Sequence, residues 1–158
     1  MEQYLGFMLV ILGGALAAGL AGCGSAIGCG IVGQAAAGVT SEDPNKFGLL
    51  LVLQALPGTQ GFYGFVGMFL ILGKLAGVNV TDISISQGLA VAFAGLPVGL
   101  VGLISAIYQG KVCAGGANLV ARRPEEIAKA MVYGAVVETY AILGLISTIL
   151  LLQNVKLG

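Results

Sequence analysis

One carboxylate, far from every other charge, is the residue of this sequence with the clearest chemistry. Glu138 lies in the stretch 130–155, which contains no other charged residue. A carboxylate near the centre of a bilayer costs roughly 2.5–3.5 kcal/mol on insertion scales, so it must be protonated, paired with a cation or turned toward a polar cavity. Such a residue is functional by default. The alternative is that Glu138 is a structural contact between helices.

Polar residues at the depth of Glu138 are its expected neighbours. A helix that begins near Glu125 places Glu138 about 20 Å along its axis, at 1.5 Å per residue. A helix that begins near Asn45 brings Gly58 to the same depth, within the stretch "LPGTQGFYG". The side chains expected to meet at this level are Thr59, Gln60, Gln109 and Glu138, with Thr139 as a further candidate.

The chemistry of this set points to a small cation. It offers one negative charge and several neutral oxygens, and the sequence contains no histidine. These ligands suit a hard monovalent ion, because a divalent ion usually requires more carboxylates. The amides and hydroxyls favour Na⁺, whereas H⁺, the alternative, needs only the carboxylate. Tyr63 is expected to donate a hydrogen bond to Glu138 and to hold its orientation.

Two prolines fall inside apolar stretches. Pro57 lacks an N–H and disturbs the preceding turn, which would turn carbonyls of residues 53–56 toward a ligand. A packing kink is the other interpretation of Pro57. Pro97 is expected to have no polar neighbours, and we interpret it as a kink.

Composition requires a membrane. The 158 residues are 58% hydrophobic and 9% charged, and the mean hydropathy is +1.00, whereas soluble domains carry about 25% charged residues. The uncharged stretches 3–41, 47–73 and 83–110, and the apolar stretch 130–155 that only Glu138 interrupts, predict an all-α, multi-pass protein of the cell membrane with four transmembrane helices. The N-terminus lacks a basic region and is expected to begin a retained helix. A net charge of zero argues against nucleic-acid binding.

The sequence repeats itself after 80 residues. Ser25 aligns with Ser105, Gly30 with Gly110, Pro44 with Pro124, Thr59 with Thr139 and Gly64 with Gly144. This repeat predicts two tandem, duplicated helical hairpins, residues 1–80 and 81–158. Gly58 stands where the second hairpin has Glu138, so we expect that the first hairpin has lost its carboxylate.

Charge in the connections predicts the sidedness. The hairpin loops 40–47 and 121–129 share one side, and they contain Lys46, Arg122, Arg123 and Lys129. The other side has Lys74 and Lys156. The positive-inside rule therefore places both hairpin loops in the cytoplasm and both termini outside.

Small residues recur at four-residue spacing on the first and third helices. Such residues let helix backbones approach closely in lipid, and the second and fourth helices are bulkier. The pattern favours a two-layered homo-oligomeric ring with helices 1 and 3 inside and helices 2 and 4 outside. An ordinary four-helix bundle is the alternative. The small residues are Ala18, Gly22, Ala26 and Gly30, and Gly102, Ala106, Gly110 and Ala114.

Two other features are interpreted as structural. The stretch "GCGIVG", Gly28 to Gly33, matches a dinucleotide-binding fingerprint, but that fingerprint requires a strand and a tight turn before its helix. It lies here in an uncharged helical stretch, so we reject a nucleotide site. Cys23, Cys29 and Cys113 are expected to be small core residues.

Three of these motifs, together with the duplicated hairpins, resemble a known family. Two fused hairpins with "LPGTQGFYGF", "AIYQGKV" and "VETYAILG" resemble the proteolipid ring subunits of V-type ATPases, and most of all the subunit K type of sodium-pumping bacterial enzymes. The resemblance covers almost the whole chain. It implies a homo-oligomeric rotor ring in the membrane that carries Na⁺, with H⁺ as the alternative ion.

The resemblance also implies partners and ligands. A stator membrane subunit would offer ion half-channels, and central-stalk subunits would bind the cytoplasmic loops. ATP hydrolysis would take place on other subunits, so the chain itself would not be an enzyme. The implied Na⁺ ligands are the main-chain oxygen of Leu56 and the side chains of Thr59, Gln60, Gln109 and Glu138, with Tyr63 supporting the glutamate. Two further hypotheses are a self-contained small carrier or channel and a structural membrane protein.

Overall fold

The computed structural model describes residues 2–157, and its regular structure is entirely helical. Four helical segments are long and apolar enough to span a membrane, as predicted. The first and third, α1 (Leu5–Glu42) and α4 (Ile85–Arg122), have 38 residues each and are longer than a bilayer requires. The second consists of α2 (Phe47–Ala55) and α3 (Thr59–Gly73), and the fourth contains α5 (Ile127–Gln153). Short 3-10 turns are η1 (Glu2–Tyr4), η2 (Pro44–Lys46), η3 (Leu56–Gly58), η4 (Val80–Asp82) and η5 (Pro124–Glu126).

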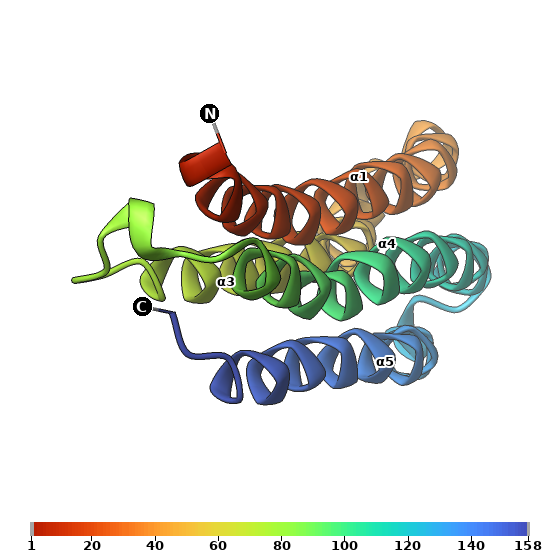
Figure 1. Cartoon of the computed structure of the whole chain (residues 1–158). Coiled ribbons are helices and arrows are strands. Elements are labelled where there is room, and N and C mark those ends of the chain that lie inside the picture. Colours follow the sequence, from red (N-terminus) through yellow and green to blue (C-terminus); the bar gives the residue numbers. More distant parts are fainter. Residues whose placement is uncertain (1, 158) are drawn as a thin grey trace.

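The two hairpin turns have the same backbone design. Asp43 and Arg123 leave the helical conformation, with φ of −140° and −141°, because a following proline disfavours it. Pro44 and Pro124 then open a 3-10 turn, where a missing N–H costs little. Both turns lie at one end of the molecule, and both termini lie at the other end (Figure 1).

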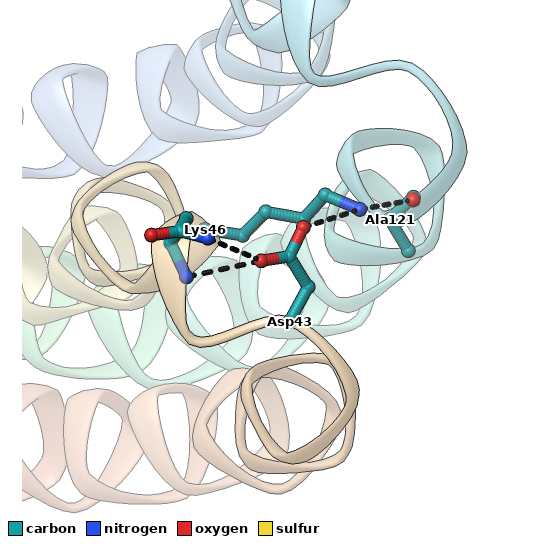
Figure 2. Close-up of polar contacts among 4 residues, drawn as sticks. Asp43, Lys46 and Ala121 are labelled. Carbon is teal, nitrogen blue, oxygen red and sulfur yellow. Dashed lines mark hydrogen bonds and ion pairs between the residues drawn. The ribbon is translucent and has the colours of Figure 1, made fainter.

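A lysine ties the first turn to the second hairpin. The Nζ of Lys46 donates a hydrogen bond to the carbonyl oxygen of Ala121, at 2.6 Å, near the end of α4. It also lies 3.4 Å from Oδ2 of Asp43 (Figure 2). The other carboxylate oxygen of Asp43 accepts hydrogen bonds from the backbone and side-chain N–H groups of Asn45, at 3.1 Å. The contact joins the two hairpins at this end.

Glycines let α1 and α4 lie against each other. A Cβ added at Gly24 would come within 2.5 Å of the Cα of Leu103, and one at Gly110 within 2.5 Å of the carbonyl oxygen of Gly28. Only glycine permits this approach. In Figure 1, α4 lies between α1 and α5, with α3 behind it.

The interior consists of two apolar clusters with polar residues between them. One cluster contains Val10, Ile71, Val91, Val98 and Leu152, and the other contains Val32, Leu50, Leu53, Cys113 and Val120. Along the helices, the buried side chains of Gln60, Ser105 and Gln109 lie between these clusters. Buried amides require hydrogen-bond partners, so this polar layer is where a functional site is to be sought.

The two prolines behave differently. Pro57 interrupts the second span, because α2 ends at Ala55 and the 3-10 turn η3 follows. Pro97 lies inside the continuous helix α4. The prediction that Pro97 has no polar neighbours is wrong, since the next residue, Val98, donates its N–H to Oγ1 of Thr148 at 3.2 Å.

The glycine-rich stretch and the three cysteines are interpreted from the sequence as structural. The stretch from Gly28 to Gly33 is part of α1, without the strand and turn of a dinucleotide-binding fingerprint. Cys113 is buried and Cys29 is half-buried. Cys23 is exposed, so the prediction of a core residue is wrong there, because this position of α1 faces away from α4.

Candidate functional site

The carboxylate of Glu138 lies where α3, α4 and α5 meet. The hydroxyl of Tyr63 on α3 donates a hydrogen bond to its Oε1, at 2.7 Å, as the sequence predicts. The Nε2 of Gln109 on α4 donates to its Oε2, at 3.3 Å. Glu138 itself is only half-buried on α5. The carboxylate is thus held by two donors from two helices and keeps an open side.

Two fully buried amides extend this arrangement inward. The Nε2 of Gln109 also donates to the carbonyl oxygen of Gly134, at 3.1 Å. The Oε1 of Gln109 accepts a hydrogen bond from Nε2 of Gln60. Both glutamines have 0% exposure, which a protein tolerates only when the amide groups are bonded.

The interruption at Pro57 supplies the remaining predicted residues. Leu56 opens η3, and its carbonyl oxygen accepts the N–H of Thr59 and the hydroxyl of Thr59, at 2.9 Å. The Oγ1 of Thr59 lies 3.4 Å from Oε1 of Gln60. Of the four carbonyls that the sequence singles out, the one of Leu56 reaches the network. One continuous network therefore joins Leu56, Thr59, Gln60, Tyr63, Gln109 and Glu138.

Acceptors outnumber donors in this network. The single hydroxyl hydrogen of Thr59 is shared between Leu56 and Gln60 and favours the shorter bond. Both hydrogens of the Gln60 amide are used, on Gln109 and Ser105. Lone pairs of the Gln60 amide oxygen, the Thr59 hydroxyl and the Glu138 carboxylate are left over. Oxygens with lone pairs and one negative charge are what a hard cation binds.

The composition of the site excludes a carboxylate-rich metal centre. Within residues 2–157, no group of three or more Cys, Asp or Glu side chains lies close enough to hold a metal ion. Glu138 is the acidic member of the network, and its other members are neutral. The site therefore matches a monovalent cation in charge.

Sequence reasoning included one residue too many and missed another. Thr139 is exposed and donates to the carbonyl oxygen of Val136, at 2.7 Å, outside the network. Ser105, 5% exposed, was missed: it accepts from Nε2 of Gln60 at 3.3 Å. Its spacing, four residues before Gln109 on the same face of a helix, is the signal that could have found it.

The two halves of the chain match the same family. Residues 12–71 and residues 92–151 each match the family model of the ATP synthase C-subunit. The two matches are displaced by the same 80 residues as the internal repeat, which confirms the tandem duplication; the hairpin bounds 1–80 and 81–158 stay a prediction.

Two relatives resemble the chain over nearly its full length. The V-type sodium ATPase subunit K of Enterococcus hirae is 47% identical over 149 residues, 94% of this chain and 93% of that protein. The A-type ATP synthase subunit K of Methanocaldococcus jannaschii is 47% identical over 151 residues, 96% of this chain and 64% of that protein.

Proposed function

Because the chain belongs to the ATP synthase C-subunit family, we propose that it is a membrane rotor-ring subunit of a V-type ATPase and carries Na⁺ at Glu138. Reversible binding of the ion is coupled to rotation, driven by ATP hydrolysis on other subunits or driving ATP synthesis in reverse. The observation that carries this proposal is the network around Glu138, in which one carboxylate meets an excess of oxygen lone pairs.

The proposed ligands are those that the network joins. The ion neutralises Glu138, so the carboxylate can pass a lipid-facing surface without an exposed charge. The Oε1 of Gln109 has a second lone pair beside its bond to Gln60. Tyr63 steadies the carboxylate. The ligands are the carbonyl oxygen of Leu56 and the side-chain oxygens of Thr59, Gln60, Gln109 and Glu138.

Sodium is favoured over the proton for two reasons. A proton would require only Glu138 and its hydrogen-bond partners. The amide oxygens of Gln60 and Gln109, both fully buried, would then have no role in binding. The relative from Enterococcus hirae is named as a subunit of a sodium ATPase. Gly58 replaces the carboxylate in the first hairpin, so each copy of the chain carries one ion per four helices.

Unfilled space on α1 supports the ring. Gly99, Gly102 and Gly110 on α4 are packed against α1, where an added Cβ would meet atoms at 2.5–2.9 Å. Their repeat equivalents on α1 have nothing within 4 Å of an added Cβ. The α4 of a second copy would fill that space by the same contact, head to tail, and such contacts form a ring when the rotation between copies closes. The equivalents are Gly19, Gly22 and Gly30. In this ring α1 and α4 form the inner layer, and α2, α3 and α5 the outer one.

The ring has proposed contacts on two sides. The hairpin loops 40–47 and 121–129 face the cytoplasm and bind central-stalk subunits, and both termini lie outside. A stator membrane subunit offers half-channels to the open side of Glu138. The positive-inside rule supports this sidedness, since the loops carry four basic residues and the other end two.

Two measurements test the proposal. A carbodiimide should modify Glu138 in the purified ring, and Na⁺ should protect it at fixed pH. Labelling that is indifferent to Na⁺ would overturn the sodium proposal and favour H⁺. In mild detergent the chain should run as a large closed oligomer, whereas a monomer or dimer would indicate a self-contained carrier or channel.

A further inference from the structure

Ser105 is a buried hydroxyl in contact with the ion-site network. It lies on α4, one turn before Gln109, and is 5% exposed. Its Oγ donates to the carbonyl oxygen of Val137 on α5, at 3.0 Å. The same Oγ accepts a hydrogen bond from Nε2 of Gln60 on α3, at 3.3 Å. One serine thus connects the backbone beside Glu138 to a proposed ligand.

These bonds have only one possible direction. A backbone carbonyl can only accept, so the single hydroxyl hydrogen of Ser105 is committed to Val137. Toward Gln60, Ser105 can therefore only accept, and the amide must present its NH₂ group. Gly134 acts in the same way: its carbonyl fixes the NH₂ of Gln109, so the oxygen of Gln109 also faces Gln60 and requires a donor.

We propose that Ser105 is a positioning residue that sets cation affinity by holding the Gln60 amide with its oxygen, rather than its NH₂ group, toward the ion. This inference rests on the proposed function of Glu138. In the opposite orientation the amide would present hydrogens to a cation and repel it. Proton binding by Glu138 depends instead on Tyr63 and Gln109, which Ser105 does not touch.

The proposal separates sodium binding from proton binding. Ser105→Ala leaves a buried N–H of Gln60 without its acceptor, which weakens the hold on the amide. We expect the Na⁺ concentration for half-protection of Glu138 against carbodiimide to rise about tenfold, in line with one lost buried hydrogen bond of about 1.4 kcal/mol. The pH profile of labelling without Na⁺ should stay unchanged.

Two variants complete the experiment on the intact ring. Ser105→Thr keeps the hydroxyl, and its methyl group has room in the adjoining groove of about 380 Å³ lined by Val101 and Tyr140, so half-protection should return to the original value. Thr148→Val removes another fully buried hydroxyl between α4 and α5 and should leave half-protection unchanged. If the alanine variant yields no ring, Ser105→Cys, a poor acceptor of similar size, should show the same rise.

The outcomes distinguish the inference from the function beneath it. Unchanged half-protection in Ser105→Ala, with normal protection of the original protein, overturns the role of Ser105 alone. An equal shift of the sodium response and of the pH profile also overturns it, because a general loosening of the site would do that. If Na⁺ fails to protect the original protein, the sodium function and this inference fall together.

Discussion

The two hairpins share a backbone design but differ in chemistry. Both turn at a proline after one non-helical residue. Yet Glu138 of the second hairpin corresponds to Gly58 of the first, and Gln109 to Cys29. Around Gly58 the surface is an apolar groove of about 440 Å³, lined by Gly22, Gly58, Gly61, Phe62 and Phe65. The packing of the fold is therefore retained where the ion chemistry is absent.

The first hairpin nonetheless contributes to the site. Thr59, Gln60 and Tyr63 come from α3. Tyr63 bonds Glu138 directly, and Thr59 and Gln60 are connected to it through Gln109. The second hairpin supplies Gln109 and the carboxylate. The difference between the halves teaches that the proposed ion site is a joint product of both hairpins, so neither half could form it alone.

Removing the carboxylate of Glu138 should have the largest effect, because neither hairpin then has a carboxylate at this position. Glu138→Gln removes the one charge that an ion can neutralise, while an amide of the same shape still accepts from Tyr63. We expect ion transport by the assembled complex to fall to background and carbodiimide labelling to disappear. Reconstituted vesicles with radioactive Na⁺ measure the first, and mass spectrometry the second.

A matched control is Gly58→Ala at the repeat-equivalent position. An added Cβ there meets only Sγ of Cys29, at 3.6 Å, which is ordinary contact. This variant should transport normally. Transport that persists in Glu138→Gln would instead make Glu138 a structural contact between helices.

The spans and the depth of the site were predictable from simple signals. Uncharged stretches separated by charged turns indicated four helices, and a rise of 1.5 Å per residue placed Gln60, Gln109 and Glu138 at one level. Depth does not determine the face of a helix. Thr139 is at the right depth, but it follows Glu138 directly and is rotated about 100° around the axis, so it points elsewhere.

Spacing from Gln109 can place Ser105 near the site, but the partner that a helix hydroxyl bonds was not predictable, for a related reason. In an apolar helix a serine or threonine commonly bonds its own backbone, as Ser147 does with the carbonyl oxygen of Leu143, at 2.8 Å. Ser105 and Thr148 instead bond across helices. The sequence around the residue is similar in both cases, because the acceptor that the hydroxyl bonds depends on which helix packs against it.

Adding an acid to the first hairpin should sharpen the comparison. Gly58→Glu places a carboxylate next to Cys29, where the second hairpin has Gln109, and beside an apolar groove. We expect a carbodiimide to modify the new carboxylate without protection by Na⁺, while Glu138 stays protected. Peptide mass spectrometry resolves the two positions. Protection of both sites at the same Na⁺ concentration would mean that the amides are dispensable.

A smaller effect is expected from Tyr63→Phe. Tyr63 is a further difference between the halves, because the equivalent residue of the second hairpin is Leu143. The change removes one hydrogen bond to the carboxylate and leaves the one from Gln109. The Na⁺ concentration for half-protection should rise roughly tenfold, which corresponds to about 1.5 kcal/mol, the lower end for a hydrogen bond to a charged group. Tyr133→Phe, at an exposed tyrosine of α5, is the control, and equal values for the two variants would remove Tyr63 from the site.

The smallest predicted effect is on thermal stability, and it distinguishes the two hairpin turns. Lys46 binds the carbonyl of Ala121 near the end of α4 and pairs with Asp43 (Figure 2), whereas Lys129 pairs with Glu126 on its own turn. A cation at a helix C-terminus contributes about 0.3–1 kcal/mol, and an exposed pair contributes little. Lys46→Met should therefore lower the thermal midpoint of the ring slightly, and Lys129→Met should leave it unchanged.

Acid should diminish the stabilisation by Asp43 in the same turn. The backbone N–H of Asn45 lowers the pKa of the Asp43 carboxyl below its usual value, and Lys46 adds to this. A lowered pKa in the folded protein means that the stabilisation is complete above the unfolded-state pKa and disappears as pH falls through the folded one. The difference between the two lysine variants should therefore shrink as Asp43 becomes protonated. If the difference instead grows at low pH, the carboxylate of Asp43 competes with Ala121 for the lysine rather than orienting it.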